Sequence, residues 1–348
     1  MSAVERRMPQ AASHGGDGAL VAAALGLDPA AVLDLSASLN PVAADPAVIV
    51  GRHLATLGRY PDPTDATTAL ARALDVDPGR LLLTNGGAEA IALLGAETGT
   101  GSVDDPEFSL YRRHLHVVPD DAQRWRSDPH NPSGLLAGAD EVAAVWDEAF
   151  YPLATGRWTS GRADAGAVVL GSLTKVFACP GLRLGFVLAA DDQGGRDLIT
   201  RLASRQPRWS VNGLAAAALP DLLAGADLPG WAAEIGRLRA ALVTVLRDRH
   251  LDPLASDANF VLVPGAPGLR DALVPHGVVV RDCASFGLGG HVRIAVPDDI
   301  GRARLAVALD RVAEQASSGA GSSGTGSSGT GSSGAGSSGV GSSGAGSW

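Results

Sequence analysis

The amino-acid sequence predicts an α/β protein, because strand and helix patterns alternate along much of the chain. Three consecutive features are the first observation. An apolar run at residues 80–84 reads as a strand, Asn85-Gly86-Gly87 reads as a turn, and residues 88–95 show helical spacing. A turn of this kind presents free backbone N–H groups at the start of a helix, where an anion can bind.

Two further apolar runs are the second observation. Residues 142–146 lead into Asp147-Glu148-Ala149-Phe150, and residues 167–170 lead into Gly171-Ser172-Leu173-Thr174-Lys175. Open α/β sheets bind their ligands where strands end in polar residues of this kind. We therefore expect the functional residues to follow these two strands.

The remaining elements extend the same pattern. Residues 66–74 and 231–248 show helical spacing, and residues 182–189 and 260–263 read as strands. Residues 278–296 alternate short apolar runs with Arg281, His291 and Arg293, which indicates a second, smaller domain. From Ser317 a five-residue repeat of the form S-S-G-x-G begins, and we expect it to be a flexible tail.

Composition excludes several classes of protein. The chain has 348 residues and a net charge of -9, so no basic nucleic-acid surface is expected and a small-molecule partner is favoured. Cys179 and Cys283 form no C-x-x-C pair, which favours a reducing, cytoplasmic location. No apolar run is long enough to predict a membrane span, and the amino terminus does not resemble a signal peptide. His114 and His116 have strand spacing, but no third ligand is evident and no metal site is expected.

The residues around Lys175 suggest the chemistry. Pyridoxal 5′-phosphate needs a lysine amine for a Schiff base, a carboxylate for its ring nitrogen, and donors for its phosphate. Ser172 and Thr174 precede the lysine and Arg183 follows it, so hydroxyls and a cation could bind phosphate near the amine. The nearby positive charge should lower the lysine pKa. Asp147, at a strand end, could pair with the ring nitrogen.

Five motifs in one order resemble the class I/II aminotransferases of pyridoxal-enzyme fold type I. In chain order they are Asn85-Gly86-Gly87-Ala88-Glu89, Asp128-Pro129-His130-Asn131-Pro132-Ser133-Gly134, Asp147-Glu148-Ala149-Phe150, Ser172-Leu173-Thr174-Lys175 with Arg183, and Arg293. The resemblance implies a large cofactor-binding domain (42–209) with a mostly parallel sheet between helices, and a smaller α/β carboxy-terminal domain (210–316). An amino-terminal arm (1–41) would pack with the small domain, and residues 317–348 would form the tail.

The same resemblance implies roles for individual residues. The Schiff base would form on Lys175, and donors from Gly87, Ala88, Ser172, Thr174 and Arg183 would bind the cofactor phosphate. Asn131 would hydrogen-bond the ring hydroxyl oxygen, Asp147 the ring nitrogen, and Phe108 would stack on the ring. Tyr60 would reach the phosphate of a neighbouring subunit, which implies a homodimer. Arg293 would bind the substrate carboxylate as a bidentate fork, with His14 and Asn40 as further substrate-binding residues.

Within the family, the chain is most similar to threonine-phosphate decarboxylases of cobalamin biosynthesis and to histidinol-phosphate aminotransferases. His14-Gly15-Gly16-Asp17 and the segment from Asp34 to Pro41 resemble the decarboxylase pattern, as does Phe150 where many aminotransferases carry tyrosine. Asn131 would then act alone at the ring oxygen, or Tyr151 would compensate. The substrate would be a small phosphorylated amino acid or amine.

Alternatives stay open at this stage. The segments 112–130 and 135–146 are shorter than the family pattern, so helical and strand layers are expected to be trimmed. The chain could be a decarboxylase, an aminotransferase, or a catalytically weak binding or regulatory relative. Most of the named residues also have a structural interpretation, as turns, exposed strand residues, ordinary core or an idle terminal histidine: Gly86-Gly87, Asn131-Pro132-Ser133-Gly134, Asp147-Glu148, Arg293, Tyr60, Phe108 and His14.

Overall fold

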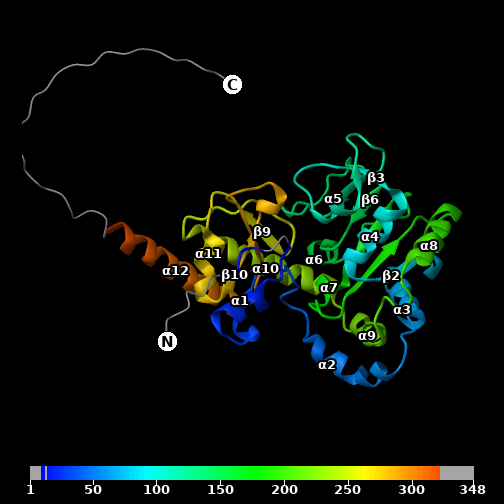
Figure 1. Ribbon diagram of the computed structural model, residues 1–348, viewed down its shortest axis with the longest axis horizontal. Coiled ribbons are helices and arrows are strands. Elements are labelled where there is room, and N and C mark those ends of the chain that lie inside the picture. Colours follow the sequence, from blue (N-terminus) through cyan, green and yellow to red (C-terminus); the bar gives the residue numbers. More distant parts are fainter. Residues whose placement is uncertain (1–8, 12–13, 322–348) are drawn as a thin grey trace, which may run out of the picture.

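The structure is a computed structural model that describes residues 9–11 and 14–321. Two bodies lie side by side, and the larger is built around a seven-stranded sheet (Figure 1). In spatial order its strands are β2 (Leu81–Asn85), β8 (Leu184–Leu188), β7 (Val168–Gly171), β6 (Val145–Asp147), β5 (Arg124–Ser127), β3 (Thr100–Val103) and β4 (His116–Val117). Only β8 is antiparallel to its neighbours. The carboxyl ends of the other strands therefore meet at one edge, where β8 begins.

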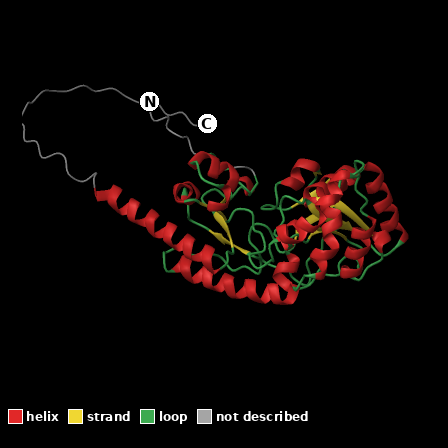
Figure 2. Ribbon diagram, turned by 90° about the horizontal axis from the view of Figure 1, so that it is seen from below, coloured by secondary structure: helices red, strands yellow, loops and turns green. Residues whose placement is uncertain are grey.

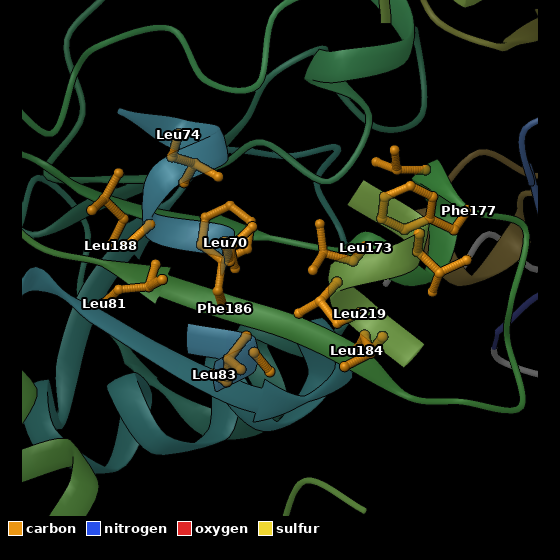
Figure 3. Close-up of a cluster of buried hydrophobic side chains, with 14 of the residues drawn as sticks. Leu70, Leu74, Leu81, Leu83, Leu173, Phe177, Leu184, Phe186, Leu188 and Leu219 are labelled. Atoms are coloured by element: carbon orange, nitrogen blue, oxygen red, sulfur yellow. The ribbon is translucent and has the colours of Figure 1, made fainter. Parts of the chain in front are cut away.

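Helices cover both faces of this sheet (Figure 2). On one face α3 (Thr64–Leu74) and α9 (Gly213–Ala224) bury leucines and alanines against Leu81, Leu83, Leu184, Phe186 and Leu188 of β2 and β8 (Figure 3). On the other face lie α4 (Gly86–Thr98), α5 (Leu110–His114) and α8 (Gln193–Arg205). Short elements complete this body: α2 (Pro46–Val50), the 3-10 segments η2 (Gly51–Gly58) and η3 (Pro78–Arg80), α6 (Tyr151–Thr155) and α7 (Leu173–Val176). The predicted mostly parallel sheet between helices is confirmed.

Helix α10 (Leu228–Arg247) joins the two bodies. Its first residue, Leu228, belongs to the apolar core of the larger body, whereas Leu238, Leu242 and Leu246 belong to the core of the smaller one. That body contains the antiparallel strands β11 (Arg281–Asp282), β12 (Val292–Ala295) and β9 (Phe260–Val263), with α11 (Leu269–Leu273), η4 (Val274–His276), η5 (Ala284–Phe286) and α12 (Asp299–Gly321).

The amino-terminal segment packs on the smaller body. After α1 (Gly18–Leu25) and η1 (Pro29–Ala31), strand β1 (Leu33–Asp34) pairs in parallel with β10 (Val278–Val279). Arg270 Nη2 lies 3.2 Å from Asp17 Oδ2, and both side chains are buried. This segment then continues toward the junction of the two bodies, beside α7 (Figure 1).

Several predictions need correction. Residue 210 does not begin the small domain, because α9 packs in the core of the larger body and the division falls within α10. Residues 317–321 of the repeat continue α12, and the rest of the predicted tail lies outside the described residues. His114 ends helix α5, so it does not share a strand face with His116. The short connections at residues 118–123 and 128–144 contain no helix. No described helix combines the length and apolar character that crossing a bilayer requires.

Candidate active site

Lys175 lies at the sheet edge where the parallel strands end. It belongs to α7, the short helix that follows β7, and its Nζ donates a hydrogen bond to the backbone oxygen of Ala37 at 2.7 Å. The ring centre of Phe150 lies 6.0 Å from the same nitrogen. Burial, assisted by the positive charges of Arg293 and Arg183, lowers the pKa of Lys175 to about 8. A reactive neutral amine is therefore far more accessible here than on an ordinary lysine.

A cradle for an anion lies beside the lysine, between the start of α4 and the start of β8. Gly86 has a φ of +76°, and a Cβ there would overlap the guanidinium of Arg183. The position of a Cβ on Gly87 would lie 3.6 Å from the Cβ of Ser172. The first N–H groups of α4, which include those of Gly87 and Ala88, have no partner within a helix. Glycine is thus required where a helix start, a hydroxyl and a guanidinium converge, and this arrangement could hold a phosphate.

Asp147, the last residue of β6, is held at both carboxylate oxygens. Tyr111 Oη donates to Oδ2 at 2.8 Å, and the backbone nitrogen of Ala149 donates to Oδ1 at 3.1 Å. Burial raises the pKa of Asp147, and the Tyr111 hydrogen bond is the first cause that opposes it. The carboxylate is therefore fixed in orientation at the same sheet edge as Lys175, whose positive charge it also senses.

Asn131 and Arg293 come together from the two bodies. Arg293 is only 6% exposed, and its Nη1 donates to Asn131 Oδ1 at 2.5 Å while its Nη2 donates to the backbone oxygen of Ser36 at 3.3 Å. Its guanidinium carbon lies 4.6 Å from the ring centre of Phe260. Burial in the first place, with repulsion by Arg281, lowers the pKa of Arg293 to about 10. Among the described residues no carboxylate forms an ion pair with Arg293, and its buried Nε has no hydrogen-bond partner.

The segment from Ser36 to Asn40, here called the strap, crosses in front of the lysine. Asn259 donates from Nδ2 to the backbone oxygens of Ser38 and Leu39. Asn40 Nδ2 donates to the backbone oxygen of Val176 in α7, and Asn40 Oδ1 accepts a hydrogen bond from the backbone nitrogen of Val42. The predicted substrate-binding role of Asn40 is therefore replaced by a structural one, since both ends of its side chain already fix the strap.

His14 and Phe108 meet at the rim of the site. Their ring centres lie 5.6 Å apart, edge to face, and Phe108 has a similar contact with Tyr111. Gly15 fits closely against the backbone of Ser36, where a Cβ has no room, so the glycine motif positions His14 against the strap. The His14 Nδ1 is buried without a partner among the described residues. Burial, then Arg281 and Arg113, lowers the pKa of His14.

Two other predicted residues lie elsewhere. Thr174 exchanges both hydrogen bonds of its hydroxyl with the backbone of Leu184, so it joins α7 to β8 instead of facing a phosphate. Tyr60 is 76% exposed and stacks on Trp209, with ring centres 4.4 Å apart. Burial and the negative charge of Glu148 raise the pKa of the Tyr151 phenol, and among the described residues no hydrogen bond joins it to Lys175 or Asn131.

A buried ion network supports the loop of Asn131 and the strand of Asp147. Arg162 Nη1 lies 2.5 Å from Asp128 Oδ2 and 3.9 Å from Glu148 Oε1, and its guanidinium covers the ring of Trp146. Asp128 and Glu148 are 1% and 2% exposed, so two buried acids share one arginine. This network replaces part of the support that a helix would give the short connection.

Sequence reasoning missed three contributors to the site. Tyr111 gave no signal beyond following Phe108 by three residues; Phe108 precedes α5, and Tyr111 is the second residue of that helix. Arg281 was visible as a charge in an apolar segment, and it lies directly opposite Arg293 in the β11–β12 pairing. Phe260 appeared only as a strand residue. Among the described residues no three potential metal ligands cluster together.

Comparison with known proteins agrees with this geometry. The family described as Aminotransferase class I and II matches residues 127–312, more than half of the chain. The threonine-phosphate decarboxylase of Salmonella typhimurium is 29% identical, over 86% of this chain and 96% of its own length. The histidinol-phosphate aminotransferase 2 of Methylococcus capsulatus is also 29% identical, over 81% of this chain and 90% of its own length.

Solved structures show the same fold. The histidinol-phosphate aminotransferase of Sinorhizobium meliloti, in complex with pyridoxal 5′-phosphate, has a TM-score of 0.74 at 19% identity, covering 90% of this chain and 99% of that chain. L-threonine-O-3-phosphate decarboxylase of Porphyromonas gingivalis has a TM-score of 0.70 at 20% identity, covering 81% and 100%. The predicted fold type I architecture is confirmed, and so, at the level of the family, is the predicted cofactor, pyridoxal 5′-phosphate. The chain belongs to the class I and II aminotransferase family.

Proposed function

We propose that this protein is a pyridoxal-phosphate enzyme that decarboxylates a small phosphorylated amino acid, with L-threonine O-3-phosphate as the best candidate. One observation carries the choice of substrate. Arg281 and Arg293 lie opposite each other on neighbouring strands, 3% and 6% exposed, and Arg293 has only neutral acceptors in Asn131 and Ser36. A buried guanidinium held by neutral acceptors favours an anionic partner, so a substrate that brings a carboxylate to Arg293 fits this site best.

The two candidate substrates differ in charge. Threonine phosphate carries a carboxylate and a phosphate, whereas histidinol phosphate carries a phosphate and no carboxylate. His14, whose buried Nδ1 has no partner among the described residues, adds a further donor near the rim. A guanidinium and an imidazole match a carboxylate together with a phosphate more closely than a phosphate alone.

The cofactor, when bound, supplies an electron sink for the bond that breaks at the substrate α-carbon. Each of the other tasks falls to a residue of this chain. Lys175 offers the amine, whose lowered pKa makes the neutral form easier to reach, and the cradle of Gly86, Gly87, Ser172 and Arg183 would bind the phosphate of the cofactor. Asp147 would hold the proton on the ring nitrogen, and Asn131 would donate to the ring oxygen. Arg293 would orient the substrate carboxylate.

A homodimer is part of the proposal. Tyr60 and Trp209 present a stacked, largely exposed aromatic pair, beside a surface cavity of about 400 Å³ lined in part by Arg59 and Pro61. Exposed aromatic pairs of this size are typical of interfaces. In the proposed dimer, Tyr60 serves the cofactor phosphate of the partner subunit.

The test uses a property of the sequence, because Lys175 is the only lysine in the chain. Borohydride reduction of the cofactor-loaded protein should attach the cofactor to one lysine peptide, and Lys175→Ala should lose both the attachment and the visible absorption band. Threonine phosphate labelled in its carboxyl carbon should then release labelled carbon dioxide without forming glutamate. Glutamate formed from histidinol phosphate and 2-oxoglutarate would instead identify the aminotransferase. Cofactor binding with neither product would identify a catalytically weak relative.

An Arg293→Lys variant sharpens this test. Lysine keeps the charge but cannot form the bidentate fork, so KM for threonine phosphate should rise by about tenfold or more. Borohydride trapping of the cofactor should be unchanged at Lys175, although the variant adds a second lysine that peptide mapping distinguishes.

A further inference from the structure

A buried phenol lies behind the carboxylate proposed to hold the cofactor ring. Tyr111, the second residue of α5, has no exposed surface, and its Oη donates to Asp147 Oδ2 at 2.8 Å. Ala149 N donates to the other oxygen. The protein thus satisfies one lone pair on each oxygen and leaves the remaining lone pairs available for a ring nitrogen.

The position of this phenol is fixed by packing. The rings of Phe108 and Trp125 each lie with their centres 5.7 Å from that of Tyr111, and the surrounding core contains Ile91 and Leu94 of α4. Burial, together with the negative charges of Asp147 and Glu107, raises the pKa of Tyr111 well above its usual value. This shift favours the protonated phenol, which donates to Asp147 Oδ2.

A fixed donor changes the basicity of its acceptor. The ring nitrogen and Asp147 would share one proton, and the less basic the carboxylate, the more completely that proton stays on the ring. A hydrogen bond to a charged acceptor contributes more than one between neutral groups. Since Asp147 is otherwise destabilised as an anion by its burial, the hydroxyl of Tyr111 is the group best placed to keep it anionic.

We propose that Tyr111 is a positioning residue that fixes the Asp147 carboxylate and thereby keeps the ring nitrogen of the bound cofactor protonated. The inference rests on the proposed function, because it needs the cofactor ring to pair with Asp147. Nothing in the motif of Asp147, at the end of β6, reveals this partner, which lies on helix α5, 36 residues earlier in the chain.

The test is a Tyr111→Phe variant loaded with cofactor labelled with ¹⁵N in its ring. In the wild type, where the ring nitrogen and Asp147 share one proton, the ¹⁵N resonance should lie close to, but short of, the shift of a fully protonated pyridine ring, and in the variant it should move toward that of the neutral ring. Cofactor affinity should fall by about tenfold, the usual effect of one hydrogen bond to a charged group. Tyr151→Phe is the matched control, since it removes a phenol hydroxyl near Glu148 and should leave both readouts unchanged.

A second arm covers a failure of Tyr111→Phe to fold. Site-specific replacement of Tyr111 by 3,5-difluorotyrosine keeps the ring and makes the hydroxyl a stronger donor, so the ¹⁵N resonance should move further toward the fully protonated ring. A purely structural role predicts no such opposite movement. A folded Tyr111→Phe protein with an unchanged ¹⁵N resonance would overturn the inference, as would an unchanged resonance in the fluorinated protein. A wild type that binds no cofactor would instead refute the proposed function.

Discussion

Lys175 should make the cofactor-free protein less stable at neutral pH than a variant without it. Burial lowers its pKa to about 8 in the folded protein, from 10.5 for an ordinary lysine amine. At 1.36 kcal/mol per unit, holding the ammonium in the folded protein costs about 3 kcal/mol at pH 7. Replacing Lys175 by methionine removes this cost and loses one hydrogen bond to Ala37, of about 1 kcal/mol. We therefore expect Lys175→Met to be more stable by about 2 kcal/mol at pH 7.

The sign of the pH dependence follows from proton counts. Between pH 8 and 10.5 the unfolded chain binds a proton at this lysine that the folded chain has released, so wild-type stability rises with pH across this window. The advantage of Lys175→Met should shrink across the same window and be nearly gone by pH 10. Other titrating groups, such as Tyr111 and the two cysteines, are common to both proteins and cancel in the difference.

Urea unfolding of both cofactor-free proteins at pH 7, 8.5 and 10 measures this difference. Because the chain has a single lysine, reductive ¹³C-methylation gives one lysine resonance, and its titration midpoint should lie near 8. A midpoint near the ordinary lysine value would refute the reasoning. So would a Lys175→Met variant that is no more stable at pH 7, or whose advantage does not change with pH.

Three further predictions concern the surroundings of the lysine. Gly86→Ala should displace Arg183 and weaken cofactor binding, measured by equilibrium dialysis, by about tenfold or more. Gly99→Ala is the control: Gly99, at the other end of α4, has a similar φ of +73° with open space around it, so the change should cost only about 1 kcal/mol of stability. Arg162→Met should destabilise the protein to urea by about 3 kcal/mol, since Asp128 and Glu148 would lose their shared partner; a loss below about 1 kcal/mol would show that the network is dispensable. Tyr60→Phe keeps the stack on Trp209, so the sedimentation coefficient should be unchanged, but loss of the hydroxyl should lower the cofactor affinity. A cofactor affinity equal to that of the wild type would argue against a role of Tyr60 across the dimer.

The arrangement of the sheet edge was predictable because it depends on local signals. Asn85-Gly86-Gly87, Asp147 and Lys175 each follow a short apolar run, and parallel strands bring such ends together whatever their separation in the chain. At Gly86 the positive φ and the approach of Arg183 leave no room for a side chain, which explains why the turn needs glycine there.

The errors have physical causes of a different kind. Thr174 has the right residue type in the right motif, but the backbone of Leu184 captures its hydroxyl, and only the register of α7 against β8 decides that. The domain boundary failed because α9 is rich in alanine and leucine, a composition that suits either core. Tyr111 was missed because its partner Asp147 is a contact between distant segments, which no local pattern encodes.

The trimmed connections do not conflict with a complete site, because their anchors are polar instead of helical. The connection between β5 and β6 returns across the sheet edge without a helix, yet Glu141 lies 2.6 Å from Arg126 and 3.0 Å from Arg124 on β5. Leu136 N donates to Asp257 Oδ2 in the smaller body. Asn131 is thus held by ion pairs on one side and by the second body on the other, so a change in the relative position of the two bodies would move Asn131 together with Arg293. Since Arg293 is proposed to bind the substrate carboxylate and Asn131 the cofactor ring, the short connection ties substrate binding to cofactor orientation more directly than a long helical one would.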